Sequence, residues 1–240
     1  MKAEKEIRDW YNDFSKKQIE ISINLRHYSI VNHLIDAGLK KNHSVLEIGC
    51  GIGTLTKLIH KYLKTGKIFA TDISDESINI AKSIFSKTSS NVEFIVTNME
   101  NFSHSNKFDF IVLPDVLEHI PIEQHRNLFQ VISNHMHDNS KILIHIPHPK
   151  ALDFIRKFQS EKLQIIDQSI SAEQLLKDTY HNGLTLVNYT SYSLYNKEAD
   201  YALIILQKNR DLSTLTPFSK PKIIYKKALS RLHFWLKMYL

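Results

Sequence analysis

Residues 45–53 constrain the fold of this chain more than any other segment. They read Val-Leu-Glu-Ile-Gly-Cys-Gly-Ile-Gly, a short apolar run followed by glycines at three alternate positions. Residues 54–62 then have a composition compatible with a helix. Glycine tolerates positive φ and has no Cβ, so such a turn lets the backbone approach a ligand closely. The helix behind it points free N–H groups into the same space. The segment therefore predicts a strand, a tight turn and a helix that together form a binding site.

Strand and helix patterns alternate along the rest of the chain. This alternation predicts an α/β fold with a doubly wound, mostly parallel sheet and helices on both faces. The last two strands are close in sequence, so we expect an antiparallel hairpin at the sheet edge. Ligands of such sheets bind beyond the carboxyl ends of the strands. Predicted strands are 44–48, 67–71, 92–96, 108–113, 141–146, 184–193 and 200–207; predicted helices lie within 1–40 and at 53–63, 75–86, 122–136 and 171–181.

The glycine spacing distinguishes between ligand classes. The dinucleotide fingerprint Gly-x-Gly-x-x-Gly needs its third glycine one residue later than Gly53, and the phosphate loop ending in Gly-Lys-Ser/Thr is absent. The spacing of Glu47, Gly49, Gly51 and Gly53 instead resembles motif I of the class I S-adenosylmethionine-dependent methyltransferases. The resemblance implies that the loop, Cys50 included, wraps the methionine part of the cofactor, and that Glu47 interacts with its amino group. It also implies a seven-stranded Rossmann-like sheet and S-adenosylhomocysteine as product. The alternative is a bare strand-to-helix turn.

Two further strand ends supply expected cofactor contacts. Asp72 ends the second strand, where a carboxylate can accept hydrogen bonds from both hydroxyls of a ribose; the alternative is an acid that starts a helix. Ile73 would then pack on the adenine. Asn98 and Met99 follow the third strand. The family often has an acid at the Asn98 position, and this chain departs from that pattern, although the asparagine carbonyl can still accept a hydrogen bond.

The N-terminal region resembles a helical lid. Related enzymes often fold such a lid over the cofactor, with a tyrosine that contacts it. Tyr11, within Asp9-Trp-Tyr-Asn-Asp-Phe14, matches that arrangement, so the resemblance implies that residues 1–40 form a lid and that Tyr11 contacts the cofactor. The alternative is an amphipathic helix that packs Trp10 and Phe14.

Candidate catalytic residues follow the fourth strand. The segment from Leu113 to Pro121 contains Leu-Glu-His, similar to the small-molecule branch of the family, including ubiquinone-pathway O-methyltransferases. It differs from the Asn/Asp-Pro-Pro-Tyr/Phe motif of amino-group nucleic-acid methyltransferases. We assign Leu113 to the cofactor site. If the segment is helical, Asp115, Glu118 and His119 share one face. His119 could then act as a general base, the three groups could hold a divalent cation, or Glu118 and His119 could be structural.

His148 is a second candidate base. It lies beyond the end of the fifth strand, where substrate should sit, between Pro147 and Pro149. A base could also be absent, because positioning the acceptor in line with the sulfonium contributes much of the rate of methyl transfer.

The charge distribution separates a body from a tail. The net charge is +6, yet residues 208–240 carry eight basic residues and one acid, and the remaining residues carry 23 basic and 24 acidic residues. A nucleic-acid methyltransferase would spread Lys and Arg over its substrate face, so we exclude DNA and disfavour RNA as substrate. We predict a methyltransferase domain at 1–207 and a basic tail at 208–240. Residues 222–239 predict an amphipathic helix that could lie on an anionic membrane, its own domain or a second subunit.

These patterns together predict a cytoplasmic enzyme, monomeric or homodimeric, that methylates a small molecule. The expected acceptor is a hydroxyl of a sugar, glycan precursor or secondary metabolite. A single cysteine, Cys50, excludes an intrachain disulfide and a multi-thiolate metal site. The charged N-terminus does not resemble a signal peptide, and no apolar run approaches the length of a membrane span. A divalent cation is allowed, but no metal ligand is assigned. The alternatives are an RNA or protein methyltransferase that docks through the tail, and a non-catalytic cofactor-binding subunit.

Overall fold

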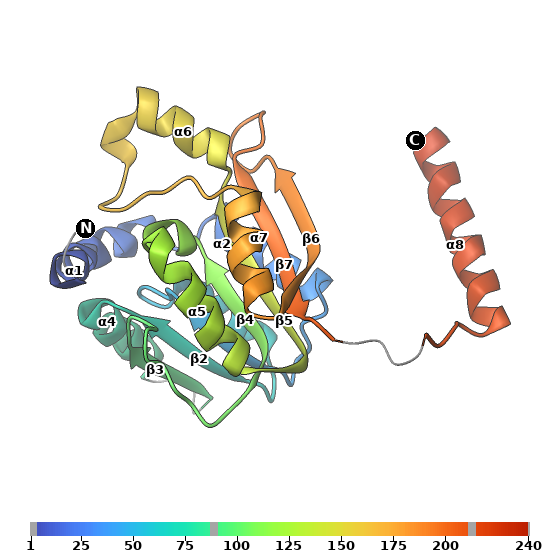
Figure 1. Ribbon diagram of the computed structural model, residues 1–240, viewed down its shortest axis with the longest axis horizontal. Coiled ribbons are helices and arrows are strands. Elements are labelled where there is room, and N and C mark those ends of the chain that lie inside the picture. The colour runs from blue at the N-terminus through green and yellow to red at the C-terminus, as the bar shows by residue number, and fades with distance from the viewer. Residues whose placement is uncertain (1–3, 87–90, 211–214, 240) are drawn as a thin grey trace. The chain divides into compact units, whose positions relative to one another are not determined.

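The computed structural model, shown in Figure 1, describes residues 4–86, 91–210 and 215–239. Contacts divide the chain into two compact units, Met1–Asn209 and Arg210–Leu240. Every strand in the described part of the chain belongs to the first unit, and the second contains one long helix, α8 (Lys220–Tyr239).

The sheet of the first unit has seven strands in the order β3-β2-β1-β4-β5-β7-β6. Strands β1 to β5 pair in parallel, and β7 pairs antiparallel with both β5 and β6. The predicted doubly wound, mostly parallel sheet with a C-terminal antiparallel hairpin is thus confirmed. The strands are β1 (Ser44–Ile48), β2 (Lys67–Asp72), β3 (Val92–Val96), β4 (Phe108–Pro114), β5 (Met136–Pro147), β6 (Leu184–Tyr192) and β7 (Tyr201–Lys208).

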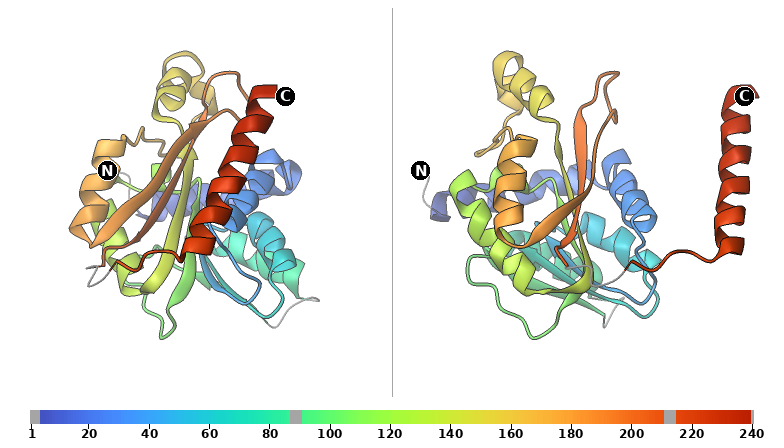
Figure 2. Two further views of the ribbon diagram at one scale, coloured as in Figure 1. Left: turned by 90° about the vertical axis from the view of Figure 1, so that its right-hand side faces the viewer. Right: turned by 45° about the vertical axis from the view of Figure 1, so that its right-hand side comes forward.

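Helices cover both faces of this sheet, as the two views in Figure 2 show. One apolar cluster joins α2, α3 and α4 to the sheet, and a second joins α5 and α7 to the opposite face. The helices of the first unit are α1 (Glu4–Ile21), α2 (Leu25–Asp36), α3 (Thr54–Tyr62), α4 (Asp75–Phe85), α5 (Ile122–Asn134), α6 (Pro149–Phe158) and α7 (Ala172–His181), with short 3-10 turns η1 (Leu117–His119) and η2 (Ser160–Lys162).

The central strands carry apolar side chains on both faces because both faces are buried. Val45 and Val112 pack in the cluster with α2, α3 and α4, whereas Leu46 and Ile111 face α5 and α7. All four side chains are fully buried. Parallel strands covered on both faces need this pattern, which explains why the sequence shows continuous apolar runs in place of alternation.

Two elements around β5 differ from the predictions. The strand begins at Met136, five residues before the predicted start at 141, and this shortens the helix predicted at 122–136. The helix α6 was not predicted, because Pro147 and Pro149 were taken to end the fifth strand and to stiffen the loop after it. Pro149 instead occupies the first turn of α6, where a missing N–H costs nothing, and His148 caps the helix.

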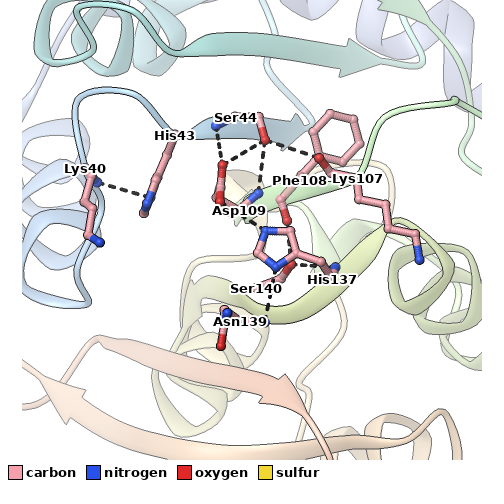
Figure 3. A network of polar contacts seen from close by, with 9 residues as sticks. All are labelled: Lys40, His43, Ser44, Lys107, Phe108, Asp109, His137, Asn139 and Ser140. Atoms are coloured by element: carbon pink, nitrogen blue, oxygen red, sulfur yellow. Dashed lines mark hydrogen bonds and ion pairs between the residues drawn. The ribbon is translucent and has the colours of Figure 1, made fainter.

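A polar network holds together the amino-terminal ends of β1, β4 and β5 (Figure 3). One oxygen of Asp109 accepts hydrogen bonds from the backbone N–H of Ser44 at 2.7 Å and from its hydroxyl at 3.0 Å. The other lies 3.0 Å from Nε2 of His137. The Ser140 hydroxyl donates to the carbonyl of Phe108 at 2.6 Å. Parallel-sheet proteins bind ligands at the carboxyl ends of the strands. The network therefore fixes the ends of the strands that are remote from the ligand-binding edge.

Candidate active site

A cavity of about 700 Å³ opens at the carboxyl ends of the parallel strands. Its floor is made by the segments that follow β1, β2, β3 and β4. One side of α1 and the chain from α6 to residue 167 complete the walls. The cavity therefore occupies the position at which doubly wound sheets bind ligands.

The loop after β1 has the backbone that its glycines predict. Gly49, Gly51 and Gly53 all have positive φ, at 80°, 53° and 81°. The backbone N–H of Gly49 donates to the carbonyl of Thr71 at 2.8 Å, which ties the loop to β2. Such angles are strained for residues with a Cβ, so this turn requires glycine.

The three glycines differ in what surrounds them. A Cβ at Gly49 would lie 2.6 Å from the side chain of Val116, and a Cβ at Gly51 would lie 2.7 Å from the side chain of Gln18. Both glycines line the cavity, whereas Gly53 begins α3 and does not. The structure thus brings Gly49 and Gly51 to the predicted cofactor site and gives Gly53 a packing role behind it.

Glu47 is a buried acid with one unsatisfied oxygen. Its Oε2 accepts a hydrogen bond from the Thr56 hydroxyl at 2.7 Å, and its Oε1 is buried without a hydrogen-bond partner among the described residues. Burial raises the pKa of Glu47 to about 8. An unsatisfied buried acceptor costs about 1–3 kcal/mol, so a ligand that donates a charged N–H here would bind favourably. Cys50 also lines the cavity, and burial raises the pKa of its thiol, which makes it a poor nucleophile.

Asp72 joins the glycine loop to α4. Its Oδ2 accepts from the backbone N–H of Gly51 at 2.7 Å, and its Oδ1 accepts from the N–H of Ser74 at 2.9 Å. The side chain therefore does support the start of α4, as the alternative interpretation proposed. Each carboxylate oxygen can still accept a second hydrogen bond from a ligand. Asp72 and Ile73 both line the cavity.

Residues at the ends of β3 and β4 divide between cavity and core. Asn98 and Met99 line the cavity. The Asn98 side-chain carbonyl accepts from the N–H of Glu100 at 3.1 Å, so it shapes the loop and retains one lone pair. Leu113 does not line the cavity: it is fully buried in the cluster with α5 and α7, and its neighbour Pro114 reaches the wall instead.

His119 is held by groups from a distant loop. Its Nδ1 lies 2.6 Å from the carbonyl oxygen of Ile166 and 3.2 Å from Oδ1 of Asp167. Its Nε2 lies 3.8 Å from Oε1 of Glu118. Oxygens at Nδ1 favour the tautomer with the proton on that nitrogen, which leaves Nε2 to accept a proton. The ring of Tyr11 lies 6.1 Å from the imidazole, and its buried hydroxyl has no hydrogen-bond partner among the described residues.

The carboxylates control the protonation of this cluster. Burial by itself would lower the pKa of His119, but the charges of Glu118 and Asp167 outweigh it and raise that pKa to about 9. Burial raises the pKa of the Glu118 carboxyl to about 8. The Glu118 Oε2 atom is buried without a hydrogen-bond partner among the described residues. Glu118 and His119 therefore hold a proton at the cavity wall near neutral pH.

Asp115 lines the cavity, but the condition for a helical face shared with His119 is not met. Only Leu117–His119 forms a turn, and Asp115 precedes it with a left-handed φ of 52°. Its Oδ1 lies 2.7 Å from Nδ1 of His145, and its Oδ2 lies 3.0 Å from Nε of Arg26. In the described residues no group of three His, Cys, Asp or Glu side chains is placed to hold a metal ion. Asp115 instead fixes Arg26 at the wall.

His148 is not brought to the site. Its Nδ1 accepts from the backbone N–H of Lys150 at 3.3 Å at the start of α6, and the residue does not line the cavity. The Nδ1 atom of His148 is thus used by the cap of α6 and not by the cavity. The geometry therefore favours His119 of the two candidate bases.

Among the cavity residues that sequence reasoning missed, two contact predicted site residues. Gln18 projects from α1 over the glycine loop, and Asp167 holds His119. For Gln18 a signal existed: Ile7, Tyr11 and Phe14 lie at helical spacing before it, so a polar group interrupts an apolar stripe, and all four line the cavity. The loop that carries Asp167 has no periodic pattern that could have placed it.

Comparisons with known proteins match this chain to methyltransferases. Residues 45–139 match the family model described as a methyltransferase domain. The chain is 38% identical over 74 residues to malonyl-[acyl-carrier protein] O-methyltransferase 1 of Ilyobacter polytropus, covering 31% of this chain and 27% of that protein. It is 29% identical over 120 residues to a ubiquinone biosynthesis O-methyltransferase of Coxiella burnetii, covering 49% and 48%. The chain thus matches less than half the length of these relatives.

Solved structures share the fold. Magnesium protoporphyrin IX methyltransferase from Synechocystis PCC 6803 aligns with a TM-score of 0.69 at 15% identity, over 86% of this chain and 100% of that one. An S-adenosylmethionine-dependent methyltransferase from Clostridium acetobutylicum aligns with a TM-score of 0.66 at 16% identity, over 83% and 99%. Identities this low show a common architecture and leave the acceptor open.

Proposed function

We propose that this chain, a class I S-adenosylmethionine-dependent methyltransferase by its fold and its matched domain, methylates a hydroxyl group of a small molecule in the cytoplasm. The proposed acceptor is a sugar, a glycan precursor or a secondary metabolite. The observation that carries this proposal is His119, whose Nδ1 is held by the Ile166 carbonyl and by Asp167 at one wall of the cavity.

The cavity fits the cofactor at its glycine-loop end. S-adenosylmethionine supplies an electrophilic methyl group on a sulfonium, and it carries an ammonium, a ribose and an adenine. The unsatisfied Oε1 of Glu47 suits the ammonium, and Asp72 suits the ribose hydroxyls. Ile73 and Met99 provide apolar surface for the adenine. The glycine loop lines this end of the cavity at Gly49 and Gly51.

The wall that carries His119 suits a hydroxyl acceptor. A hydroxyl must lose its proton as it is methylated, and Nε2 of His119 can accept that proton while Asp167 stabilises the resulting imidazolium. The acidic groups Glu118 and Asp167 disfavour an anionic acceptor at this wall, because its charge would be repelled there. The Tyr11 hydroxyl, buried and without a partner among the described residues, can donate to the acceptor or to the cofactor.

Two measurements test the proposal. Calorimetry should detect S-adenosylmethionine and S-adenosylhomocysteine, but neither NADH nor ATP. A radiolabelled methyl donor should then label members of a panel of sugars, glycan precursors and phenolic metabolites. Labelling of RNA or protein with no metabolite labelled would contradict the small-molecule assignment. Cofactor binding with no transfer to any acceptor would favour a non-catalytic subunit.

His119→Asn should lower kcat/KM about 10²–10⁴-fold, the usual contribution of a positioned general base, and leave cofactor affinity unchanged. His148→Asn is the matched control, because His148 caps α6 and does not line the cavity. Equal losses in the two variants would remove His119 from the proposed role.

A further inference from the structure

The second unit consists mainly of α8, whose charge is entirely of one sign. The helix contains six basic residues and no acidic one. It also contains a tryptophan, two tyrosines, a phenylalanine and several aliphatic residues. A helix that combines these two compositions is neither a transmembrane span nor an ordinary solvated helix. Across the described residues no helix is long and apolar enough to cross a membrane.

Six apolar residues of α8 gather on one side of the helix. Helical geometry turns about 100° per residue, so residues at i, i+4, i+7 and i+11 align on one side. Tyr225, Leu229, Leu232 and Leu236 have this spacing, with Ile224 and Trp235 beside them. We call these six residues the apolar face of α8. Three other apolar residues, Ile223, Phe234 and Met238, lie on the opposite side.

Basic residues flank the apolar face along both edges. The same geometry places Lys222, Lys226 and Lys237 along one edge and Lys220, Lys227 and Arg231 along the other. The long side chains of Lys and Arg can lie along apolar surface and keep their charges in the polar layer. Charge on both edges of an apolar stripe suits a helix that lies flat at a boundary between apolar and anionic layers.

Local contacts support α8 as a defined helix. Its first turn receives a backbone hydrogen bond from the N–H of Ile223 to the carbonyl of Ser219 at 3.0 Å. The ring of Phe218 lies 4.7 Å from the ammonium of Lys222 and 4.5 Å from that of Lys226. Cation–π contacts at this range stabilise the first turns by about 0.5–1 kcal/mol each when exposed.

We propose that α8 binds the surface of a membrane that contains anionic lipid. The apolar face inserts at the level of the headgroups, with Trp235 and the tyrosines near the interface, and the basic edges contact lipid phosphates. Nucleic acid is a weaker match, because a phosphate backbone uses the charges and leaves a continuous aliphatic stripe without a role. The enzyme would thereby be concentrated on acceptors at or near that surface. This binding is independent of the proposed reaction.

The test measures sedimentation of the full-length chain with vesicles, without cofactor or acceptor. Vesicles of phosphatidylcholine with phosphatidylglycerol should bind the protein, and vesicles of phosphatidylcholine alone should bind it far less. Replacing Lys226 and Lys227 by Gln should lower the partition coefficient about 25-fold, because each lysine near an anionic surface contributes about fivefold. Lys61→Gln with Lys64→Gln, a pair on the first unit, should leave it unchanged.

A second pair of variants tests the orientation of the helix. Leu232→Gln removes an apolar group from the centre of the apolar face and should lower binding at least tenfold. Ile223→Gln makes a similar change on the other side and should lower it much less. Circular dichroism would verify that both variants keep the helical content of the native chain. Equal effects of the two changes, equal binding to neutral vesicles, or dimerisation through α8 without lipid binding would each overturn the proposal.

Discussion

His119 shows how neighbouring charges can prepare a base. Asp167 and the Ile166 carbonyl hold Nδ1, and Glu118 lies near Nε2. Both carboxylates favour the imidazolium, so the pKa of His119 is raised to about 9. The residue is then mostly protonated at neutral pH, and only its neutral fraction can act as a base.

This protonation state predicts the pH dependence of the reaction. Below about pH 9, kcat/KM should rise as pH rises, by up to tenfold per unit, because deprotonation of His119 produces the active form. Asp167→Asn removes one stabilising charge, so it should lower the pKa and shift the rise to lower pH. Steady-state profiles of the two proteins test this. A native profile that is flat between pH 6 and 9 would remove His119 as the titrating base.

Glu47 should control the affinity for the cofactor. Its Oε1 has no hydrogen-bond partner among the described residues, and its pKa is raised to about 8. Glu47→Gln should weaken binding of S-adenosylhomocysteine about 10–100-fold, the range for a hydrogen bond between charged groups. Native affinity should also weaken as pH falls below 8, because a protonated Glu47 cannot pair with an ammonium. Calorimetry at several pH values measures both effects, and a pH-independent affinity would contradict the assignment.

The element that most depends on local chemistry is the turn between β1 and α3. Its glycines combine positive φ with close neighbours, and the two effects can be separated by comparison with Gly183. That glycine also has a positive φ, 68°, but a Cβ there would meet no atom within 4 Å. Gly49 has both the angle and Val116 in contact.

Gly49→Ala should therefore destabilise the chain by about 2–5 kcal/mol, the sum of left-handed strain and overpacking. Gly183→Ala should cost only the strain, about 1–2 kcal/mol. Urea unfolding of the two variants measures the difference in the free energy of unfolding. Equal losses would mean that the contact with Val116 relaxes without cost.

Asp109, which joins the amino-terminal ends of the strands, should stabilise the folded chain. Its hydrogen bonds from Ser44 and His137 outweigh partial burial and lower its pKa in the folded chain. A depressed pKa stabilises the folded state above the pKa of the unfolded chain, and that stability is lost as pH falls through the folded value. Asp109→Asn should cost about 1–2 kcal/mol at neutral pH and reduce the loss of stability in acid. Thermal unfolding of the native chain and the variant at neutral and acid pH measures both effects. If the variant loses as much stability in acid as the native chain, the role assigned to Asp109 is wrong.

At the scale of the whole molecule, charge is divided between the two units. The whole positive excess lies in residues 208–240, and the rest of the chain carries one more acidic than basic residue. Salt screens charges at exposed surfaces far more than contacts inside a cavity. The two functions should therefore respond differently to ionic strength.

Raising the salt concentration should release the chain from anionic vesicles, and it should change the dissociation constant for S-adenosylhomocysteine much less. Sedimentation and calorimetry across the same salt series compare the two. Vesicle binding that persists in high salt would show that the charges of α8 are not what holds it to the membrane.

The sequence by itself determined the architecture of the sheet and the position of the cofactor loop. Strands buried on both faces appear as apolar runs, and the turn after β1 needs glycine at positions 49 and 51. Both features depend on residues that are close together in the sequence, so the sequence predicts them. Asp72 was found for the same reason, because the end of a strand is a local feature.

Only the tertiary structure decided which side chains meet in the cavity. Asp167 reaches His119 across 48 positions of sequence, Gln18 reaches Gly51 from α1, and Asp115 pairs with Arg26 at the cavity wall. His148 and Leu113 were assigned to the site because they lie near strand ends. In the structure His148 caps α6, and Leu113 is buried in the core. The physical reason is that periodicity specifies which face of its own element a residue occupies, while contacts between elements depend on how loops without periodicity pack at the edge of the sheet.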